Sequence, residues 1–225
     1  MDIFESIYND KSIYNRYKEI EMFEDKTDGW AHHNWTHVMN VTTMTESILK
    51  QLNVSDEYIE ASKIAAILHD IGANEGKDGH ALRGEIYARK YFIAHNLDFS
   101  YRKETLSSIE NHSGGFDSTE LMTLALIISD KLDITKSRVG KAGYLVEGMR
   151  QLQYIERVSI EITKDIVKVI FESSPEIDIE ELSSFYFIHK VFRAVDSFSK
   201  KIKRTNIIEI NGTVWNIKVN NKADA

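Results

Sequence analysis

Cysteine is absent from the 225 residues, so the chain can form neither a disulfide nor a thiolate metal site. No apolar run approaches the roughly 18 residues of a membrane-spanning helix, so we expect no membrane partner. Basic residues are also in deficit, because 28 Lys and Arg against 35 Asp and Glu give a net charge of −7. This balance argues against binding to bulk nucleic acid, which needs a basic surface. The segment from Met1 to Glu5 is acidic and lacks a secretory pattern, so we expect a cytoplasmic protein.

Proline occurs only once, at Pro175, and the chain up to about residue 150 has the apolar spacing of α-helices. Thr27-Asp28-Gly29 interrupts the first helical segment, and Ser55 is predicted to cap a later helix. The predicted helices span about residues 3–23, 34–52, 55–70, 81–95, 103–111 and 121–132. The sequence therefore predicts a mainly α protein with a helical bundle over residues 1–150.

The apolar period changes from helical to alternating after about Tyr154, which predicts a β-hairpin with its turn at Lys164-Asp165. Asp178 with Glu181 then marks a helix start, and one apolar stripe runs from Ile188 to Ile202. Asn211-Gly212 predicts a second hairpin turn between Ile208/Ile210 and the alternating residues Trp215, Ile217 and Val219. We therefore expect a small C-terminal α+β module of ββαββ order over residues 151–225.

His69 and Asp70 stand together at the end of an apolar helix, where unpaired polar groups are costly to bury. A metal ion between the two side chains would satisfy both, because imidazole and carboxylate together suit Zn, Fe and Mn. Further His and Asp residues fall at or near other predicted helix ends, namely His37, His80, His112 and Asp130. One rim of a helical bundle can gather such ends, so these residues are predicted to bind metal.

Five motifs in this order resemble those of the HD-domain metal-dependent phosphohydrolase superfamily over about residues 30–140. They are His37-Val38-Met39-Asn40-Val41, His69-Asp70-Ile71-Gly72, His80-Ala81-Leu82-Arg83-Gly84, Asn111-His112-Ser113-Gly114 and Ser129-Asp130-Lys131-Leu132-Asp133. The chain is most similar to the two-metal branch, which includes the bacterial dinucleoside-tetraphosphate hydrolases and, less closely, the HD-GYP cyclic-dinucleotide phosphodiesterases. The G-Y-P signature of the latter is absent, and Ala73-Asn74 stands where two-metal members often carry Lys.

The resemblance implies a first metal held by His37, His69, Asp70 and Asp130, and a second held by Asp70, His80 and His112. Two divalent ions would share Asp70, with Fe or Mn favoured over Co, Zn or Mg. A metal-bridged hydroxide would cleave a phosphate ester or anhydride bond of a small substrate, a nucleotide or dinucleotide. Asp70, Lys131 and Arg138 would act in catalysis. Arg83 is a further candidate phosphate ligand, and Lys77 could replace the missing Lys.

Other interpretations remain open from the residues alone. Lys131 could equally form an ion pair with Asp130 or Asp133, and Asp133 could orient a metal ligand or be a solvated acid. His33 is expected at a pocket rim or exposed rather than as a ligand, and the stripe from Ile188 to Ile202 is either core or a homodimer interface. The chain could instead be a nucleotide-sensing regulatory or scaffold protein with weak turnover. A metal that only stabilises the bundle fits less well, because structural sites prefer closed ligand shells.

Overall fold

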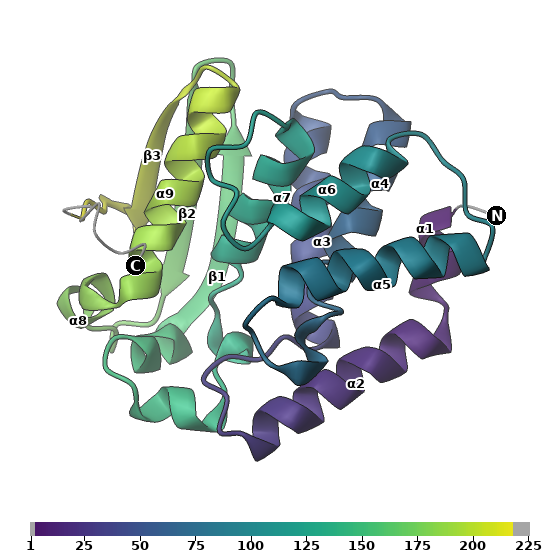
Figure 1. Cartoon of the computed structure of the whole chain (residues 1–225). Helices are drawn as coiled ribbons and strands as arrows, with labels where there is room; N and C mark the ends of the chain where they lie inside the picture. The colour runs from purple at the N-terminus through teal and green to yellow at the C-terminus, as the bar shows by residue number, and fades with distance from the viewer. Residues whose placement is uncertain (1–2, 218–225) are drawn as a thin grey trace.

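A computed structural model describes residues 3–217, which form a helical bundle and a small C-terminal sheet (Figure 1). The fold is the predicted one, mainly α with an α+β module. The helices are α1 (Ile3–Tyr8), α2 (Lys11–Lys26), α3 (Trp35–Gln51), α4 (Asp56–Leu68), α5 (His80–Ala94), α6 (Arg102–Asn111), α7 (Leu121–Leu132), α8 (Ile179–Ser184) and α9 (Tyr186–Lys201). The short 3-10 helices are η1 (Ala73–Glu75), η2 (Lys136–Arg138), η3 (Lys141–Leu145) and η4 (Met149–Tyr154). No helix of residues 3–217 has the length and apolar character to cross a membrane.

Helix starts are fixed by side-chain caps. Asn34 and Ser55 accept hydrogen bonds from backbone N–H groups of the first turns of α3 and α4, as predicted for Ser55. The prediction of a single helix over residues 3–23 is wrong, because the structure has two helices here, α1 and α2. Asp10 caps α2 by accepting from Ser12 N at 2.7 Å, so a local hydrogen bond starts a new helix where the apolar pattern continues.

The bundle is held together by an apolar core to which the first seven helices contribute. Its fully buried members include Val41 of α3, Ile64 and Leu68 of α4, Phe92 of α5 and Leu126 of α7. Burying side chains of this size stabilises a fold by roughly 1.5–3 kcal/mol each. This rigid packing fixes the helix ends on which the predicted metal ligands lie.

The C-terminal sheet has the order β1-β2-β3-β4, with β1 (Ile155–Ile162), β2 (Ile166–Ser173), β3 (Thr205–Ile210) and β4 (Thr213–Val214). The two hairpins are antiparallel, whereas β2 and β3 pair in parallel through the connection that carries α8 and α9. The predicted turn at Asn211-Gly212 is confirmed, since both residues have positive φ, of 48° and 77°. The expected continuous helix after Asp178 is instead broken at Phe185, and Val219 lies outside the described residues.

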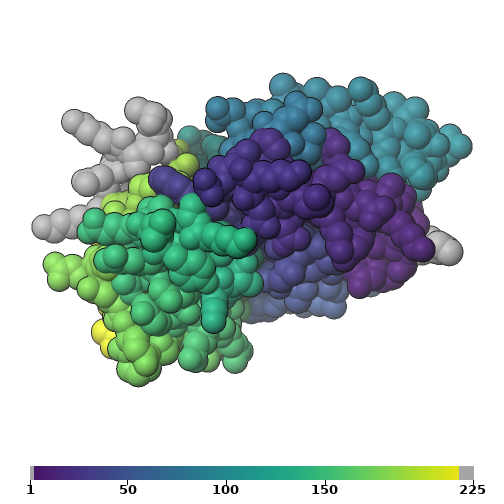
Figure 2. Space-filling view, turned by 90° about the horizontal axis from the view of Figure 1, so that it is seen from below, coloured from purple at the N-terminus to yellow at the C-terminus, as the bar shows by residue number. Residues whose placement is uncertain are grey.

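One contiguous core joins the bundle to the module. Ile127 and Ile128 of α7 belong to the same buried cluster as Val191 and Val195 of α9 and Val169 of β2. The apolar stripe of α9 is therefore core within the chain, as one of the two predicted alternatives stated. Seen from below, the N-terminal helices adjoin the segment that follows α7, so residues far apart in sequence form one face (Figure 2). A domain boundary near residue 150 stays a prediction.

Candidate metal centre

The six predicted metal ligands converge on one buried place, and each comes from a helix end. His37 lies in the first turn of α3, Asp130 in the last turns of α7, and His80 begins α5. His69 and His112 immediately follow α4 and α6, and Asp70 follows His69. Two groups of ligand atoms result, each within 4.8 Å of one another: His37, His69, Asp70 and Asp130 in one, and Asp70, His80 and His112 in the other.

Gly72 permits the close approach that brings His80 beside Asp70. A Cβ added at Gly72 would lie 2.3 Å from the carbonyl oxygen of His80 and 2.4 Å from the backbone nitrogen of Gly84. Both contacts are with backbone atoms of α5, which cannot rotate away. The glycine after His-Asp is therefore required by packing, because only hydrogen fits between this turn and α5.

All four histidines present the same ring nitrogen to the cluster. The Nδ1 atom of His69 lies 2.7 Å from the carbonyl oxygen of Ala66. In the same way, Nδ1 of His80 lies 2.6 Å from Lys77 O, and Nδ1 of His112 lies 2.7 Å from Ile109 O. For His37, Nδ1 lies 2.6 Å from a carboxylate oxygen of Asp133. Carbonyl and carboxylate oxygens only accept, so each Nδ1 carries the hydrogen and each Nε2 lone pair is free to bind a metal.

Asp70 divides its two oxygens between the two groups. Its Oδ2 atom lies 3.2 Å from His37 Nε2 and 3.1 Å from His69 Nε2, whereas Oδ1 lies 3.2 Å from His80 Nε2 and 3.3 Å from His112 Nε2. Asp130 Oδ1 lies 3.2 Å from His37 Nε2 on the first side. This is the arrangement of a carboxylate that can bridge two cations.

The cluster contains buried polar atoms that a cation would satisfy. Among residues 3–217, His37 Nε2, His69 Nε2 and Asp70 Oδ2 are fully buried and form no hydrogen bond. His80 Nε2 and His112 Nε2 face each other at 2.9 Å, although both are lone-pair nitrogens. Leaving such groups unsatisfied costs about 1–3 kcal/mol each. Four imidazole nitrogens and two carboxylates therefore fit divalent metal ions.

The charges around the cluster also favour cations. Burial would raise the pKa of Asp70, but the positive charge of a protonated His69 and further contacts hold it well below its usual range. Burial lowers the pKa of His69, yet Asp70 and Asp130 overcome this and raise it to about 10. His112 differs, because burial lowers its pKa to about 4. His69 therefore holds a proton at neutral pH when no metal is present, whereas His112 is neutral.

Asp133 orients His37, as one predicted alternative stated. Its second carboxylate oxygen accepts a 3.0 Å hydrogen bond from the side-chain amide of Asn40, which fixes the carboxylate on two sides. Burial opposes ionisation, but the interaction with His37 lowers the pKa of Asp133 overall. A buried carboxylate behind a ligating histidine raises the basicity of the imidazole and sets its orientation.

The basic residues near the centre differ in how free they are. Lys131 forms a close ion pair with Asp130, and Arg138 Nη2 lies 4.0 Å from Asp130 Oδ1. Arg83 is a further candidate phosphate ligand from the sequence, but its guanidinium donates to the carbonyl oxygens of Gly72, Gly76 and Asp78. Arg83 therefore holds the loop before α5, and the catalytic roles of Asp70, Lys131 and Arg138 stay predictions.

Of the two positions expected for His33, exposed or at a pocket rim, the exposed one is wrong, because His33 is 4% exposed and lines a cavity. Its backbone N–H donates to Glu24 at 2.9 Å, and its ring Nδ1 lies close to the same carboxylate. Burial raises the pKa of Glu24 to about 7 despite the hydrogen bond from His33. Sequence reasoning missed Glu24, because an acid in the last turns of an exposed-looking helix gives no sign of burial.

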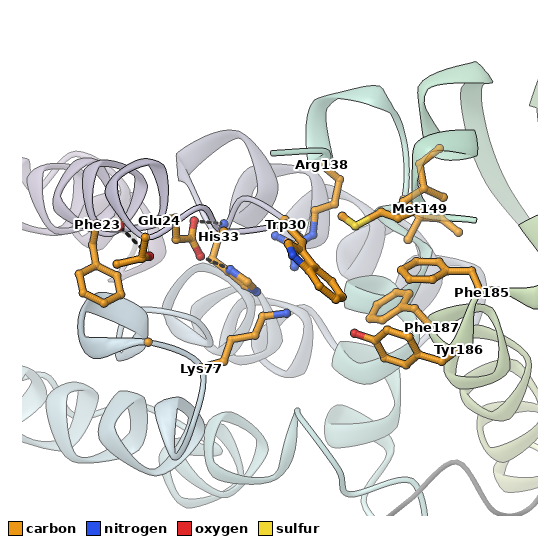
Figure 3. A pocket seen from close by; sticks show the side chains of 16 residues that line it. Phe23, Glu24, Trp30, His33, Lys77, Arg138, Met149, Phe185, Tyr186 and Phe187 are labelled. Carbon is orange, nitrogen blue, oxygen red and sulfur yellow. Dashed lines mark hydrogen bonds and ion pairs between the residues drawn. The ribbon is translucent and has the colours of Figure 1, made fainter. Parts of the chain in front are cut away.

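A cavity of about 270 Å³ adjoins the centre (Figure 3). Its walls come from α2, the 27–33 segment, the loop before α5, the segment after α7, and the junction of α8 and α9. Its lining includes Trp30, Lys77, Arg138, Met149, Phe185, Tyr186 and Phe187. Lys77 is exposed to solvent, yet partial desolvation by the surrounding cavity walls and the charge of Arg138 lower its pKa to about 8. Sequence reasoning did not predict the aromatic residues of this cavity.

The fold and the site define a helical bundle with a histidine- and aspartate-rich candidate metal centre. Residues 34–145 match the family model described as HD domain, and all six predicted ligands lie within the match. A search of the curated proteins finds no match. Residues 34–145 are therefore an HD domain, the domain of a superfamily of generally metal-dependent hydrolases, as the sequence motifs indicated.

Proposed function

We propose that this protein is a two-metal phosphohydrolase that cleaves a phosphate ester or anhydride bond, with a nucleotide as substrate. The observation that carries the proposal is the division of Asp70 between two sets of Nε2 atoms, at 3.1–3.2 Å on one side and 3.2–3.3 Å on the other. A centre for one ion would not need a second pair of imidazoles on the far oxygen. The complete ligand set favours turnover over a purely sensing role.

His37, His69, Asp70 and Asp130 would hold one ion, and Asp70, His80 and His112 the other. The donor set suits Fe or Mn ahead of Co, Zn or Mg. When bound, such ions polarise phosphoryl oxygens and supply a nucleophilic water of lowered pKa. Asp133 keeps His37 in the tautomer that presents Nε2, and the backbone carbonyls of Ala66, Lys77 and Ile109 do the same for the other three rings.

Arg138 and Lys77 are the best placed cations for the substrate phosphate. Arg138 is buried, and its Nη1 atom has no hydrogen-bond partner within residues 3–217. A guanidinium presents donors in a planar fork that matches phosphate oxygens. Lys131 is less available, because Asp130 neutralises it and its ammonium lies 5.7 Å from the centre of the Phe187 ring. Its role is to balance the charge of Asp130.

The proposal is tested by metal analysis of the purified protein together with hydrolysis assays across nucleotides, dinucleotides and simple phosphate esters. The expected result is bound metal and phosphate release that chelation abolishes and metal restores. His95→Ala serves as a control, since His95 is exposed at the far end of α5 from His80, where its ring stacks on that of Tyr91. A metal-loaded protein that binds nucleotides without hydrolysing any phosphate would favour the alternative of a nucleotide-sensing regulator.

A further inference from the structure

The cavity beside the metal centre has two chemically different ends. Glu24, His33, Lys77 and Arg138 form the polar end, and Met149 with the aromatic residues forms the other (Figure 3). The polar end adjoins the metal centre, because the His33 ring centroid lies 6.0 Å from that of His37 and 6.3 Å from that of His80. A ligand that fills the cavity therefore needs an anionic group near the metals and an apolar group on the opposite side.

The polar end is built for an anion. The Nη1 atom of Arg138 is buried against the cavity without a hydrogen-bond partner in the described chain, and its Nη2 atom only reaches Asp130 at 4.0 Å. An unsatisfied buried donor is costly, and a phosphate oxygen would satisfy it. Lys77 approaches from the loop before α5, with its ammonium directed toward the middle of the cavity (Figure 3).

The other end is built from flat rings. Three consecutive residues of the C-terminal module, Phe185, Tyr186 and Phe187, form one wall, and Phe185 stacks on Phe187 at 6.2 Å. Trp30 lies opposite, from the segment between α2 and α3 (Figure 3). Trp30 and Tyr186 are each 49% exposed, although the Lys190 ammonium lies 5.9 Å from the centre of the Tyr186 ring. Nucleobases stack on exposed aromatic faces, whereas an inorganic phosphate has no flat apolar face to cover them.

The volume limits what this end can take. At about 270 Å³ the cavity lies just below the range of small-molecule sites, roughly 300–1,000 Å³. So small a volume favours one base over two. We propose that the cavity binds the base of a single nucleotide, so that the aromatic wall from the C-terminal module selects nucleotides among phosphate esters. Selection among substrates rests on the proposed function, because it requires hydrolysis. Binding of the base does not rest on it.

Base binding is tested without turnover by titrating the metal-loaded full chain with adenosine, guanosine, cytidine and uridine in a calorimeter. Nucleosides carry no phosphate, so hydrolysis cannot interfere. We expect saturable binding of at least one nucleoside and none of ribose. Tyr186→Ala and Trp30→Ala should each weaken binding about tenfold, the scale of one lost stacking contact. Tyr144→Ala is the matched control, since Tyr144 is 36% exposed and does not line the cavity.

The second arm compares kcat/KM for nucleoside monophosphates with that for ribose 5-phosphate. The parent should prefer a nucleotide at least about tenfold, and Tyr186→Ala should lose most of this preference while keeping its metal content. Absence of nucleoside binding, an equal kcat/KM for ribose 5-phosphate, or a stronger preference for phenyl phosphate would each overturn the inference. In that case, hydrolysis of ribose 5-phosphate or phenyl phosphate would still support the proposed phosphohydrolase function. Nucleoside binding without hydrolysis of any phosphate would instead contradict the phosphohydrolase function and leave base binding supported.

Discussion

Replacing Gly72 by alanine tests how the chain brings the second group of ligands together. The new Cβ would meet the His80 carbonyl oxygen at 2.3 Å, the Gly84 nitrogen at 2.4 Å and the Arg83 carbonyl carbon at 2.9 Å. Ordinary contact begins near 3.4 Å, so α5 must move by about 1 Å. Gly72 has φ of −88°, which any residue adopts, so the effect is purely steric.

A movement of this size has separate consequences for stability and for metal binding. Overpacking of this kind costs about 1–3 kcal/mol, which lowers the Tm of a chain of this length by roughly 2–12 °C. His80 moves with α5, whereas ligand distances tolerate only about 0.2 Å. The second group should therefore lose its metal, while the group of His37, His69, Asp70 and Asp130 keeps one.

The assay is thermal unfolding together with metal content and phosphate release, for Gly72→Ala beside Gly114→Ala. Gly114 lies close after His112, and a Cβ there would have no neighbour within 4 Å, so this control should match the parent. A Gly72→Ala protein with the Tm, metal content and activity of the parent would refute the packing argument.

Three other predictions concern the surroundings of the ligands. Asp133→Asn should lower metal affinity roughly 10- to 100-fold in equilibrium dialysis, because His37 loses the carboxylate that fixes its tautomer; unchanged affinity would contradict this. Arg83→Met should loosen the 72–79 loop and reduce metal retention more than it raises KM, since Arg83 donates to three loop carbonyls. A rise in KM without loss of metal would instead indicate that Arg83 binds the substrate phosphate. The third concerns pH: the pKa of His69 is about 10 in the metal-free fold against about 6.5 unfolded. Its protonation stabilises the metal-free fold fully below about pH 6.5, and this stability is lost as pH rises toward 10. The Tm difference between metal-loaded and metal-free protein should therefore widen from pH 6.5 to 8.5, and a constant difference would contradict the shift.

The convergence of the candidate ligands was predictable because their order along the chain coincides with helix ends. His37, His69, His80, His112 and Asp130 each lie beside a break in the apolar pattern, and breaks of this kind meet at the rim of a bundle. Local signals also located Ser55 as a cap and Asn211-Gly212 as a turn. The break at Asp10 was missed because the apolar pattern continues across it, and only the hydrogen bond to Ser12 N separates the helices.

The cavity could not be predicted for a different reason. Trp30 and Tyr186 are separated by more than 150 positions, and their approach depends on how α9 packs against α7. Phe185, Tyr186 and Phe187 resemble core residues in the sequence, because nothing local shows that a cavity lies in front of them. The hydrogen-bond partners of Arg83 could not be predicted, because they are backbone carbonyls, which have no signature in the sequence.

The most direct test of the account is the number of metal ions per chain, measured by mass spectrometry of the parent and four variants. The two-metal arrangement predicts a ratio near two for the parent, near one for His80→Ala and His112→Ala, near one for His37→Ala, and near zero for Asp70→Ala, which removes the shared carboxylate. The rate of phosphate release should fall in all four variants, because each loses several kcal/mol of transition-state stabilisation. A parent that binds one ion, with His80→Ala fully active, would contradict the bridging role of Asp70.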